Sequence, residues 1–310
     1  MSGELFDLII VGAGPAGLTA CLYASRSLLK TLLLEKGPVG GQVIYTDLIE
    51  NYPGFPGGIS GYELIERIQK QLEDYEYQFL QEEVIDLREV EEVKEVHLSS
   101  GKVLKAKAVI LALGAKPRKL GVPGEKEFTG RGVSYCAICD GPFFKGEEVA
   151  VIGGGNTALQ EALYLTKYVK KVYLIHRREA FRATPILQER VKKNPQIEII
   201  IPAVVEEIKG EDRVEKLVYR DLKSNKKREL EVAGVFIFIG HEPETGWLKG
   251  KLEMDESGFI IVDREMRTSR PGIFACGDCV SKKFRQIINA CGEGAVAALN
   301  AEEYIKNLEK

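Results

Sequence analysis

The sequence lacks the features that mark membrane and exported proteins. No apolar run reaches bilayer-spanning length without charged residues or glycines, and the run from Leu5 to Val11 leads directly into a glycine-rich loop. The N-terminal segment has neither the basic residues nor the cleavage site of a secretory signal peptide. We therefore expect a cytoplasmic protein without a membrane partner.

Histidine is scarce, the chain has no net positive charge, and cysteine is not abundant. The six cysteines among 310 residues do not indicate a disulfide scaffold. The formal net charge of −3 excludes the overall basic field that favours nucleic acid. The local basic run Lys226-Lys227-Arg228 is interpreted as an exposed hairpin turn. The length leaves room for two globular domains.

Two segments share one design, in which an apolar strand leads into a glycine-rich loop, a helix and a second strand. In the first copy, the strand from Phe6 to Val11 precedes a helix from about Pro15 to Leu29. In the second copy, the strand from Val149 to Ile152 precedes a helix that ends at about Tyr168. The repeat indicates a duplicated nucleotide-binding fold.

The two glycine loops are candidate dinucleotide sites. The first glycine of such a loop permits a tight turn, the second lets the backbone approach a pyrophosphate, and the third position packs helix on strand. The N-terminus of the helix then offers free N–H groups to the phosphates. The predicted binding residues are Gly12, Gly14, Pro15, Ala16 and Gly17 in the first loop, and Gly153, Gly155, Asn156, Thr157 and Ala158 in the second.

The ends of the second strands differ in charge. Glu35 ends the strand from Thr31 in the first copy, where a carboxylate accepts hydrogen bonds from a ribose diol, as in FAD or NAD. The second copy has basic residues there, and guanidinium groups bind the 2′-phosphate of NADPH. These residues are His176, Arg177, Arg178 and Arg182. The alternative is a basic, solvated turn.

The remaining segments suggest that one domain interrupts the other. Stretches rich in proline and glycine lie at 114–124 and 240–243, and the segment from Phe259 onward has no glycine loop of its own. We infer that this last segment, with a helix from Glu293 to Asn307, completes the first domain. The predicted fold is α/β, with two Rossmann-like three-layer dinucleotide-binding domains, the second inserted into the first. The first domain would comprise residues 1–117 and 245–310, and the second residues 118–244.

A C-x-x-C pair lies inside the second domain, just before its glycine loop. Cys136 and Cys139 have the spacing of a reversible disulfide, in which one thiolate attacks a partner disulfide and the other resolves it. The adjacent Asp140 is placed to move the proton of this exchange. Zinc is the competing use, but no histidine cluster accompanies the pair. We interpret the other pair, Cys276 and Cys279, as small buried thiols beside a turn.

Together these motifs make the chain resemble the bacterial-type, low-molecular-weight thioredoxin reductases, over nearly its whole length. The resemblance rests on the order of the motifs and on the C-x-x-C-D inside the second domain. The motifs are Gly12 to Gly17, Gly40-Gly41-Gln42, Glu50 to Gly54, Cys136 to Asp140, Gly153 to Ala158, His176 to Arg178 with Phe181-Arg182, and Gly277-Asp278 with Arg285-Gln286.

The resemblance implies a homodimer in which an FAD domain is interrupted by an NADPH domain that rotates between half-reactions. It implies that Cys139 faces the flavin, Cys136 attacks thioredoxin and Asp140 is the acid. It places thioredoxin near Arg131 and the pair Phe143-Phe144. The implied flavin-lining residues are Glu35, Lys36, Gly41, Gln42, Asn51, Val84, Ala115, Asp278, Arg285, Gln286 and Ile287.

Two alternatives remain from the sequence. One is a related flavin disulfide reductase with another protein partner, such as a peroxiredoxin-reducing or glutaredoxin-like enzyme. The other is a non-catalytic flavoprotein that senses redox state through its disulfide.

Overall fold

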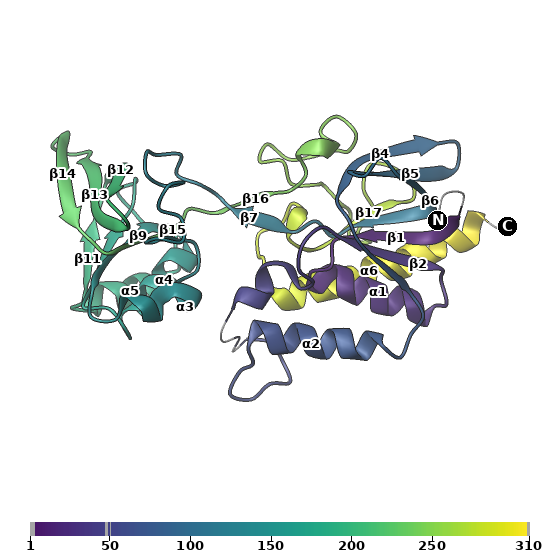
Figure 1. Ribbon diagram of the computed structural model, residues 1–310, viewed down its shortest axis with the longest axis horizontal. Coiled ribbons are helices and arrows are strands. Elements are labelled where there is room, and N and C mark those ends of the chain that lie inside the picture. Colours follow the sequence, from purple (N-terminus) through teal and green to yellow (C-terminus); the bar gives the residue numbers. More distant parts are fainter. Residues whose placement is uncertain (1–3, 47–48, 50, 309–310) are drawn as a thin grey trace. The chain divides into compact units, whose positions relative to one another are not determined.

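The computed structural model describes residues 4–46, 49 and 51–308, apart from the side chain of Cys139. Glu50, which begins one of the family motifs, lies outside the described residues. The chain divides into two compact units (Figure 1). Unit 1 comprises Met1–Lys116 and Glu242–Lys310, and unit 2 comprises Pro117–His241.

Unit 1 is built on a seven-stranded sheet in the order β3-β2-β1-β6-β5-β4, with β17 also paired to β6. Strands β1, β2, β3, β6 and β17 run parallel, whereas β4 and β5 form an antiparallel meander. The strands are β1 (Leu5–Val11), β2 (Thr31–Glu35), β3 (Gln78–Gln81), β4 (Val84–Val90), β5 (Val93–Leu98), β6 (Val103–Leu111) and β17 (Ile273–Ala275). The helices are α1 (Pro15–Arg26), α2 (Gly61–Leu72) and α6 (Ile287–Leu308), with 3-10 turns η1 (Gly41–Tyr45), η3 (Gly246–Leu248) and η4 (Gly277–Cys279).

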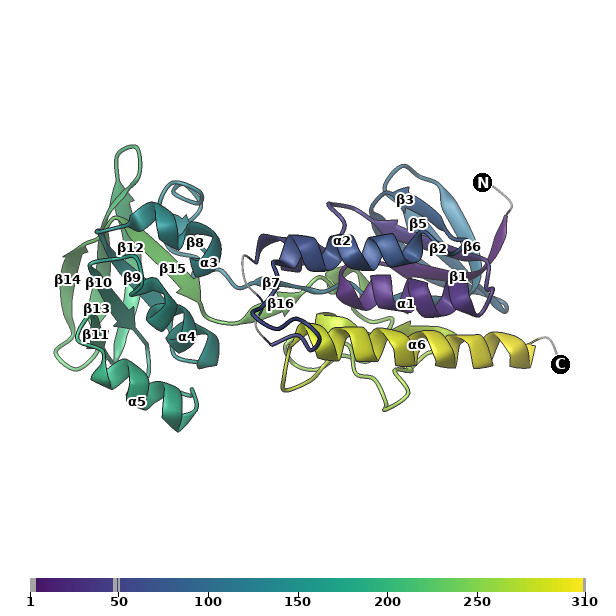
Figure 2. The same ribbon diagram turned by 90° about the horizontal axis from the view of Figure 1, so that it is seen from below.

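The sheet of unit 1 is buried on both faces. In β1, Leu8 and Ile10 join the core beneath the helices, whereas Ile9 and Val11 join the core on the opposite face. Figures 1 and 2 show α1, α2 and α6 together on one side of the sheet. Burial on both faces explains why β1 is a continuous apolar run rather than an alternating one.

Unit 2 repeats this design around a smaller parallel sheet in the order β11-β10-β9-β15-β8. Three helices pack on one face and a three-stranded antiparallel sheet covers the other (Figure 2). The central strands are β8 (Val133–Ser134), β9 (Glu148–Gly153), β10 (Lys171–Ile175), β11 (Ile197–Ile200) and β15 (Gly234–Phe238). The covering strands are β12 (Ala203–Gly210), β13 (Val214–Asp221) and β14 (Lys226–Glu231). The helices are α3 (Ala137–Asp140), α4 (Asn156–Leu165) and α5 (Pro185–Lys193), with the 3-10 turn η2 (Gly141–Phe144). These layers confirm the predicted α/β fold class.

Two short strands carry the chain between the units. They are β7 (Ala115–Pro117) and β16 (His241–Pro243), and they pair with each other. The stretch 114–124, which the sequence predicts as a linker, therefore begins with a paired strand. No helix within the described ranges is long and apolar enough to cross a membrane.

Three expected elements differ in the structure. Helix α1 ends at Arg26, short of the predicted Leu29, because Leu28 adopts a left-handed conformation with φ 58°. Helix α6 begins at Ile287, earlier than predicted, and its Gly294 allows close packing on α1, where a Cβ would lie 2.2 Å from the Ala16 oxygen. The interpretation of residues 226–228 as a turn is wrong. These residues open β14, and the turn lies at residues 222–225.

Candidate functional site

The first glycine loop joins β1 to α1 through close backbone contacts. Gly12 has a φ of 104°, and a Cβ added to it would lie 2.3 Å from the carbonyl oxygen of Ala112. A Cβ on Gly17 would lie 1.8 Å from the Gly12 oxygen. Gly14 is the exception, because a Cβ there would meet no atom within 4 Å. The outer two glycines thus serve packing, and Gly14 leaves open space before the N-terminus of α1.

A second glycine pair faces this open space. The Gly40 N–H donates to the Ala13 oxygen over 2.8 Å. A Cβ on Gly41 would lie 3.6 Å from the Gly14 Cα. Both Gly40 and Gly41 have positive φ, which keeps side chains out of this region. Backbone therefore lines a cradle of the kind that admits a pyrophosphate.

Glu35 lies beside this cradle and also holds the loop in place. Its Oε2 accepts a hydrogen bond from the Ala13 N–H at 2.7 Å, and its Oε1 accepts one from the Gly37 N–H at 2.9 Å. Each carboxylate oxygen retains a lone pair for a ribose hydroxyl. The sequence indicated the ribose role but not the contact with Ala13.

Several predicted flavin-lining residues gather around η4 and the start of α6. The Oδ1 of Asp278 is buried without a hydrogen-bond partner, although the Lys282 ammonium lies 3.5 Å away. Arg285 donates to the carbonyl oxygens of Asp278, Lys282 and Val280, which fixes the turn. A Cβ on Gly277 would lie 2.8 Å from the Ala16 Cβ, so η4 also packs on the first glycine loop. The Asp278 oxygen, which accepts no hydrogen bond, and the open cradle fit a dinucleotide with a hydroxylated chain, as in FAD.

The remaining predicted residues of this group occupy varied positions. The Asn51 amide donates to the Gln286 Oε1 over 2.8 Å, and Ile287 is the first residue of α6. Val84 and Ala115 are buried at the starts of β4 and β7, and Gln42 is exposed in η1. The Lys36 ammonium pairs with Glu244 at 2.5 Å, and so it has a carboxylate partner within unit 1.

The second glycine loop repeats the geometry of the first. A Cβ on Gly153 would lie 2.3 Å from the Phe238 oxygen, whereas one on Gly155, the N-cap of α4, would meet nothing within 4 Å. A Cβ on Gly154 would lie 2.5 Å from the His176 ring. His176 is 6% exposed, and burial together with Arg182 and Arg178 lowers the pKa of its imidazole. A neutral His176 ring therefore packs against this loop at Gly154.

The structure brings the predicted arginines to the rim of the second loop. The N–H groups of Arg182 and Ala183 donate to the Gly154 oxygen at 2.7 and 3.2 Å. The Thr184 N–H donates to Asn156 Oδ1 at 2.8 Å. Arg177, Arg178 and Arg182 are exposed, and none forms an ion pair with another described residue. Their positive charge is available to an anion bound at α4.

The dithiol segment lies in unit 2, on the helical side of the sheet. Cys136 is disulfide-bonded, and the side chain of its predicted partner Cys139 lies outside the described part of the chain. The Cys136 N–H donates to Ser134 Oγ at 3.0 Å, and the Asp140 N–H donates to the Cys136 oxygen at 3.2 Å. The short helix α3 thus carries the C-x-x-C-D sequence.

The two aromatic residues that follow the dithiol, Phe143 and Phe144, differ in exposure and packing. Phe143 is 81% exposed. Phe144 instead packs edge-on against Phe236, with ring centroids 5.3 Å apart. Arg131 is exposed and donates to the backbone oxygens of Glu127 and Asp212. Only Phe143 of the pair offers a free ring.

Sequence reasoning missed two acidic residues near the dithiol. Glu125 is 3% exposed and accepts hydrogen bonds from the N–H groups of Leu120 and Gly121 and from the Tyr135 hydroxyl, at 2.6–2.8 Å. It therefore ties the segment after β7 to the residue before Cys136. Glu161, on α4, forms no hydrogen bond or ion pair with any described residue. Neither belongs to a recognisable motif, so only the fold identifies them.

The second cysteine pair has the character that the sequence suggests. Cys276 and Cys279 are free thiols with no exposed surface. Burial raises the pKa of Cys276 well above its usual value and that of Cys279 to about 11, which keeps both thiols protonated.

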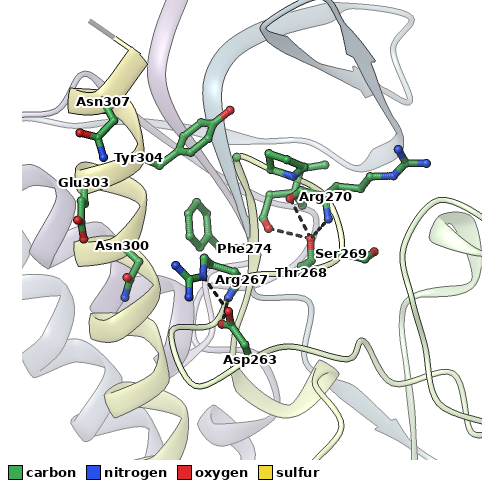
Figure 3. A pocket seen from close by; sticks show the side chains of 13 residues that line it. Asp263, Arg267, Thr268, Ser269, Arg270, Phe274, Asn300, Glu303, Tyr304 and Asn307 are labelled. Carbon is green, nitrogen blue, oxygen red and sulfur yellow. Dashed lines mark hydrogen bonds and ion pairs between the residues drawn. The ribbon is translucent and has the colours of Figure 1, made fainter. Parts of the chain in front are cut away.

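A surface hollow of about 460 Å³ lies elsewhere in unit 1, between residues 263–274 and the last turns of α6 (Figure 3). Tyr304 and Asn300 reach toward it from α6, and Arg267 at its edge is paired with Asp263 at 2.7 Å. None of its lining residues is a predicted site residue.

Comparison with known proteins identifies similar chains over the full length. The family model described as pyridine nucleotide-disulphide oxidoreductase matches residues 6–294. The thioredoxin reductase of Treponema pallidum is 46% identical over 304 residues, and that of Peptoclostridium litorale is 43% identical over 311. Both alignments cover 98% of each chain. The crystal structure of Lactococcus lactis thioredoxin reductase in its FR conformation has a TM-score of 0.89 and 42% identity, and covers 97% of this chain and 99% of that one.

The open space at Gly14 generates a prediction that separates binding from folding. Gly14→Ala adds a methyl group where no protein atom lies, so the stability of the flavin-free protein should change by less than about 0.5 kcal/mol. The methyl group should nevertheless obstruct the pyrophosphate and lower the flavin content of the purified protein. Gly17→Ala is the matched control, because its methyl group meets backbone and should cost about 1–3 kcal/mol even without flavin. Normal flavin binding by Gly14→Ala would contradict the cradle.

Proposed function

This chain belongs to the pyridine nucleotide-disulphide oxidoreductase family, and we propose that it is a thioredoxin-disulfide reductase that uses NADPH and FAD. The observation that carries the proposal is the disulfide of Cys136 on the segment directly before the second glycine loop. Two loops with opposite charge at their strand ends accompany this disulfide. The predicted homodimer, cytoplasmic location and absence of nucleic-acid or membrane partners belong to the proposal.

Unit 1 would hold FAD and unit 2 would hold NADPH. In unit 1, the cradle of Gly14 and Gly41 receives the pyrophosphate, Glu35 binds a ribose, and Asp278 hydrogen-bonds to the flavin side chain. In unit 2, Gly155 and the start of α4 face the pyrophosphate of NADPH. When bound, FAD carries two electrons from the nicotinamide to the disulfide.

The arginines at the rim of the second loop would select the phosphorylated coenzyme. Arg177 and Arg178 follow β10 after the intervening His176, near the position where the 2′-substituent of a bound dinucleotide lies. Their guanidinium groups form bidentate hydrogen bonds with a phosphate. Arg182 is held at the same loop through its N–H bond to Gly154. His176 contributes by supporting Gly154 rather than by contacting the phosphate.

The reduced dithiol would pass its electrons to thioredoxin by thiol–disulfide exchange. The Cys136 thiolate attacks one sulfur of the thioredoxin disulfide, forms a mixed disulfide and releases the other sulfur as a thiolate. Cys139 then attacks Cys136, which restores the enzyme disulfide and releases reduced thioredoxin. Asp140, at the end of α3, exchanges the protons of these steps. Phe143 offers an apolar contact for the partner.

Rotation between the units is part of the proposal. The dithiol must meet the flavin in one half-reaction and thioredoxin in the other. Only two strands, β7 and β16, carry the chain between the units, and residues such as Gly114 and Gly240, with positive φ, flank them. Such connections permit a hinge motion.

The assigned order of electron transfer predicts a selective defect. Cys136→Ser should abolish NADPH-driven reduction of thioredoxin, because a hydroxyl cannot attack a disulfide. Reduction of the flavin by NADPH, followed by its absorbance in a stopped-flow instrument, should remain within about twofold of the wild type. Cys291→Ser alters a free cysteine outside the dithiol and should retain both activities. Loss of flavin reduction in Cys136→Ser would refute the order, and its continued reduction of thioredoxin would refute the dithiol.

The arginine rim predicts coenzyme selectivity. Replacing Arg177 and Arg178 by Ala should raise the KM for NADPH by roughly 10- to 100-fold, because about 1–3 kcal/mol of charge-assisted hydrogen bonding is lost. The KM for NADH should change little, since NADH has no 2′-phosphate. Arg190→Ala, which removes an exposed arginine on α5, is the matched control. Equal effects on the two coenzymes would show that these arginines do not bind the phosphate.

A further inference from the structure

Glu161 is a partly buried acid on α4 of unit 2. Its Oε2 is buried without a hydrogen-bond partner, and its carboxyl forms no ion pair or hydrogen bond with any described residue. A buried carboxylate oxygen without a partner is costly, so such atoms are uncommon unless they serve a function.

Glu161 shares a face of α4 with residues that pack against the end of the dithiol segment. The residue after Asp140, Gly141, packs against α4, where its Cβ would lie 3.0 Å from Leu165 and 4.0 Å from Tyr164. Residues three and four positions apart on a helix share one face. Glu161 precedes Tyr164 by three positions and Leu165 by four, so it lies one turn along the same face. Helices α3 and α4 pack together and lie side by side in both views.

Few titratable groups surround Glu161. On α3 the group is Asp140, and on α4 the groups are Tyr164 and Tyr168, whose hydroxyl oxygens lie 3.1 Å apart. Helix α5 packs on α4 through buried Leu187 and Val191, and its charged residues are exposed. Strand β15 has no charged residue. The charged groups of β9 and β10 have partners of their own, in the contacts Glu148–Lys170, Tyr173–Glu148 and Lys171–Glu198.

Burial alone sets the protonation of this carboxyl. It raises the pKa of Glu161 to about 7, and no neighbouring charge contributes. Glu161 is therefore neutral below that pH and becomes a partly buried anion above it. A new negative charge nearby raises the pKa of such an acid further, so the acid binds a proton when that charge appears.

We propose that Glu161 is a positioning residue that binds a proton when the Cys136–Cys139 disulfide is reduced, and so limits the negative charge around the dithiol. The inference rests on the proposed function, because it requires that this disulfide be the redox centre. No motif indicates such a role for Glu161, and it is distinct from the acid role assigned to Asp140.

The balance of the reduction shows where the extra proton goes. NADPH supplies a hydride, which is equivalent to two electrons and one proton, and these break the S–S bond to give one thiol and one thiolate. The thiolate charge then favours the uptake of a second proton from water by the Glu161 carboxylate. At about pH 6 Glu161 already carries its proton, so the additional uptake should appear only between about pH 7 and pH 8.

The test is the pH dependence of the dithiol redox equilibrium in the flavin-bound protein. The protein is equilibrated without oxygen in dithiothreitol buffers of graded redox ratio, and the reduced fraction of Cys136 is measured by alkylation and mass spectrometry. The slope of the midpoint potential against pH gives the protons bound per two electrons. Between about pH 7 and pH 8, reduction of the dithiol should bind fewer protons per two electrons in Glu161→Gln than in the wild type, by a measurable fraction of one proton. At about pH 6 the slopes of the two proteins should agree.

Two further variants make the result decisive. Glu189→Gln removes an exposed carboxylate from α5 and should match the wild type at every pH. Glu161→Met is also uncharged and of similar length, and it should behave as Glu161→Gln does. If Glu161→Gln fails to retain flavin, Glu161→Met is used in its place. Equal slopes for the wild type and the Glu161 variants would overturn the inference and leave the proposed function intact. Failure of the wild type to reduce thioredoxin with NADPH would instead overturn the proposed function.

Discussion

A Cβ at position 17 would lie 1.8 Å from the Gly12 carbonyl oxygen, and unit 1 depends on this close contact between the end of β1 and the first turn of α1. The contact fixes where the helix begins and directs its free N–H groups at the space beside Gly14. Glu35 then binds the Ala13 N–H, and Gly277 packs on Ala16. In unit 2, a close backbone contact at Gly153 likewise leaves no room for a side chain. The strand–helix turn therefore positions every other part of each site.

Charge distinguishes two sites that share this backbone. The first strand end has a carboxylate held by backbone N–H groups, whereas the second has three exposed guanidinium groups that form no ion pair with any described residue. This difference lets one chain hold two different dinucleotides and gives the electrons a direction. The disulfide of Cys136 lies in the unit with the arginines, so the proposed function requires that unit to move between flavin and thioredoxin. In this account, a mobile unit and a fixed order of carriers are parts of one mechanism.

Features set by local backbone geometry were predictable from the sequence. The glycine loops, the buried strands and the α/β class follow from residue types at fixed spacing, and the family resemblance is confirmed by relatives that match the full length. Features that depend on distant contacts were not predictable. The burial of His176 beneath Gly154, the packing of Phe144 on Phe236 and the isolation of Glu161 arise only when separate elements meet. The predicted start of α6, Glu293, follows Gly292, whose helix-weakening effect is local, whereas α6 also packs on distant Ala16 through Gly294.

The central claim is that electrons pass from NADPH through one flavin to one disulfide in the same chain. An anaerobic titration of the flavin-bound protein with NADPH, followed by flavin absorbance, tests it most directly. Each NADPH delivers two electrons, and the flavin and the disulfide each accept two. Complete reduction should therefore consume about two equivalents of NADPH per flavin. Complete reduction by about one equivalent would show that the disulfide does not receive electrons from the flavin, and it would contradict the account.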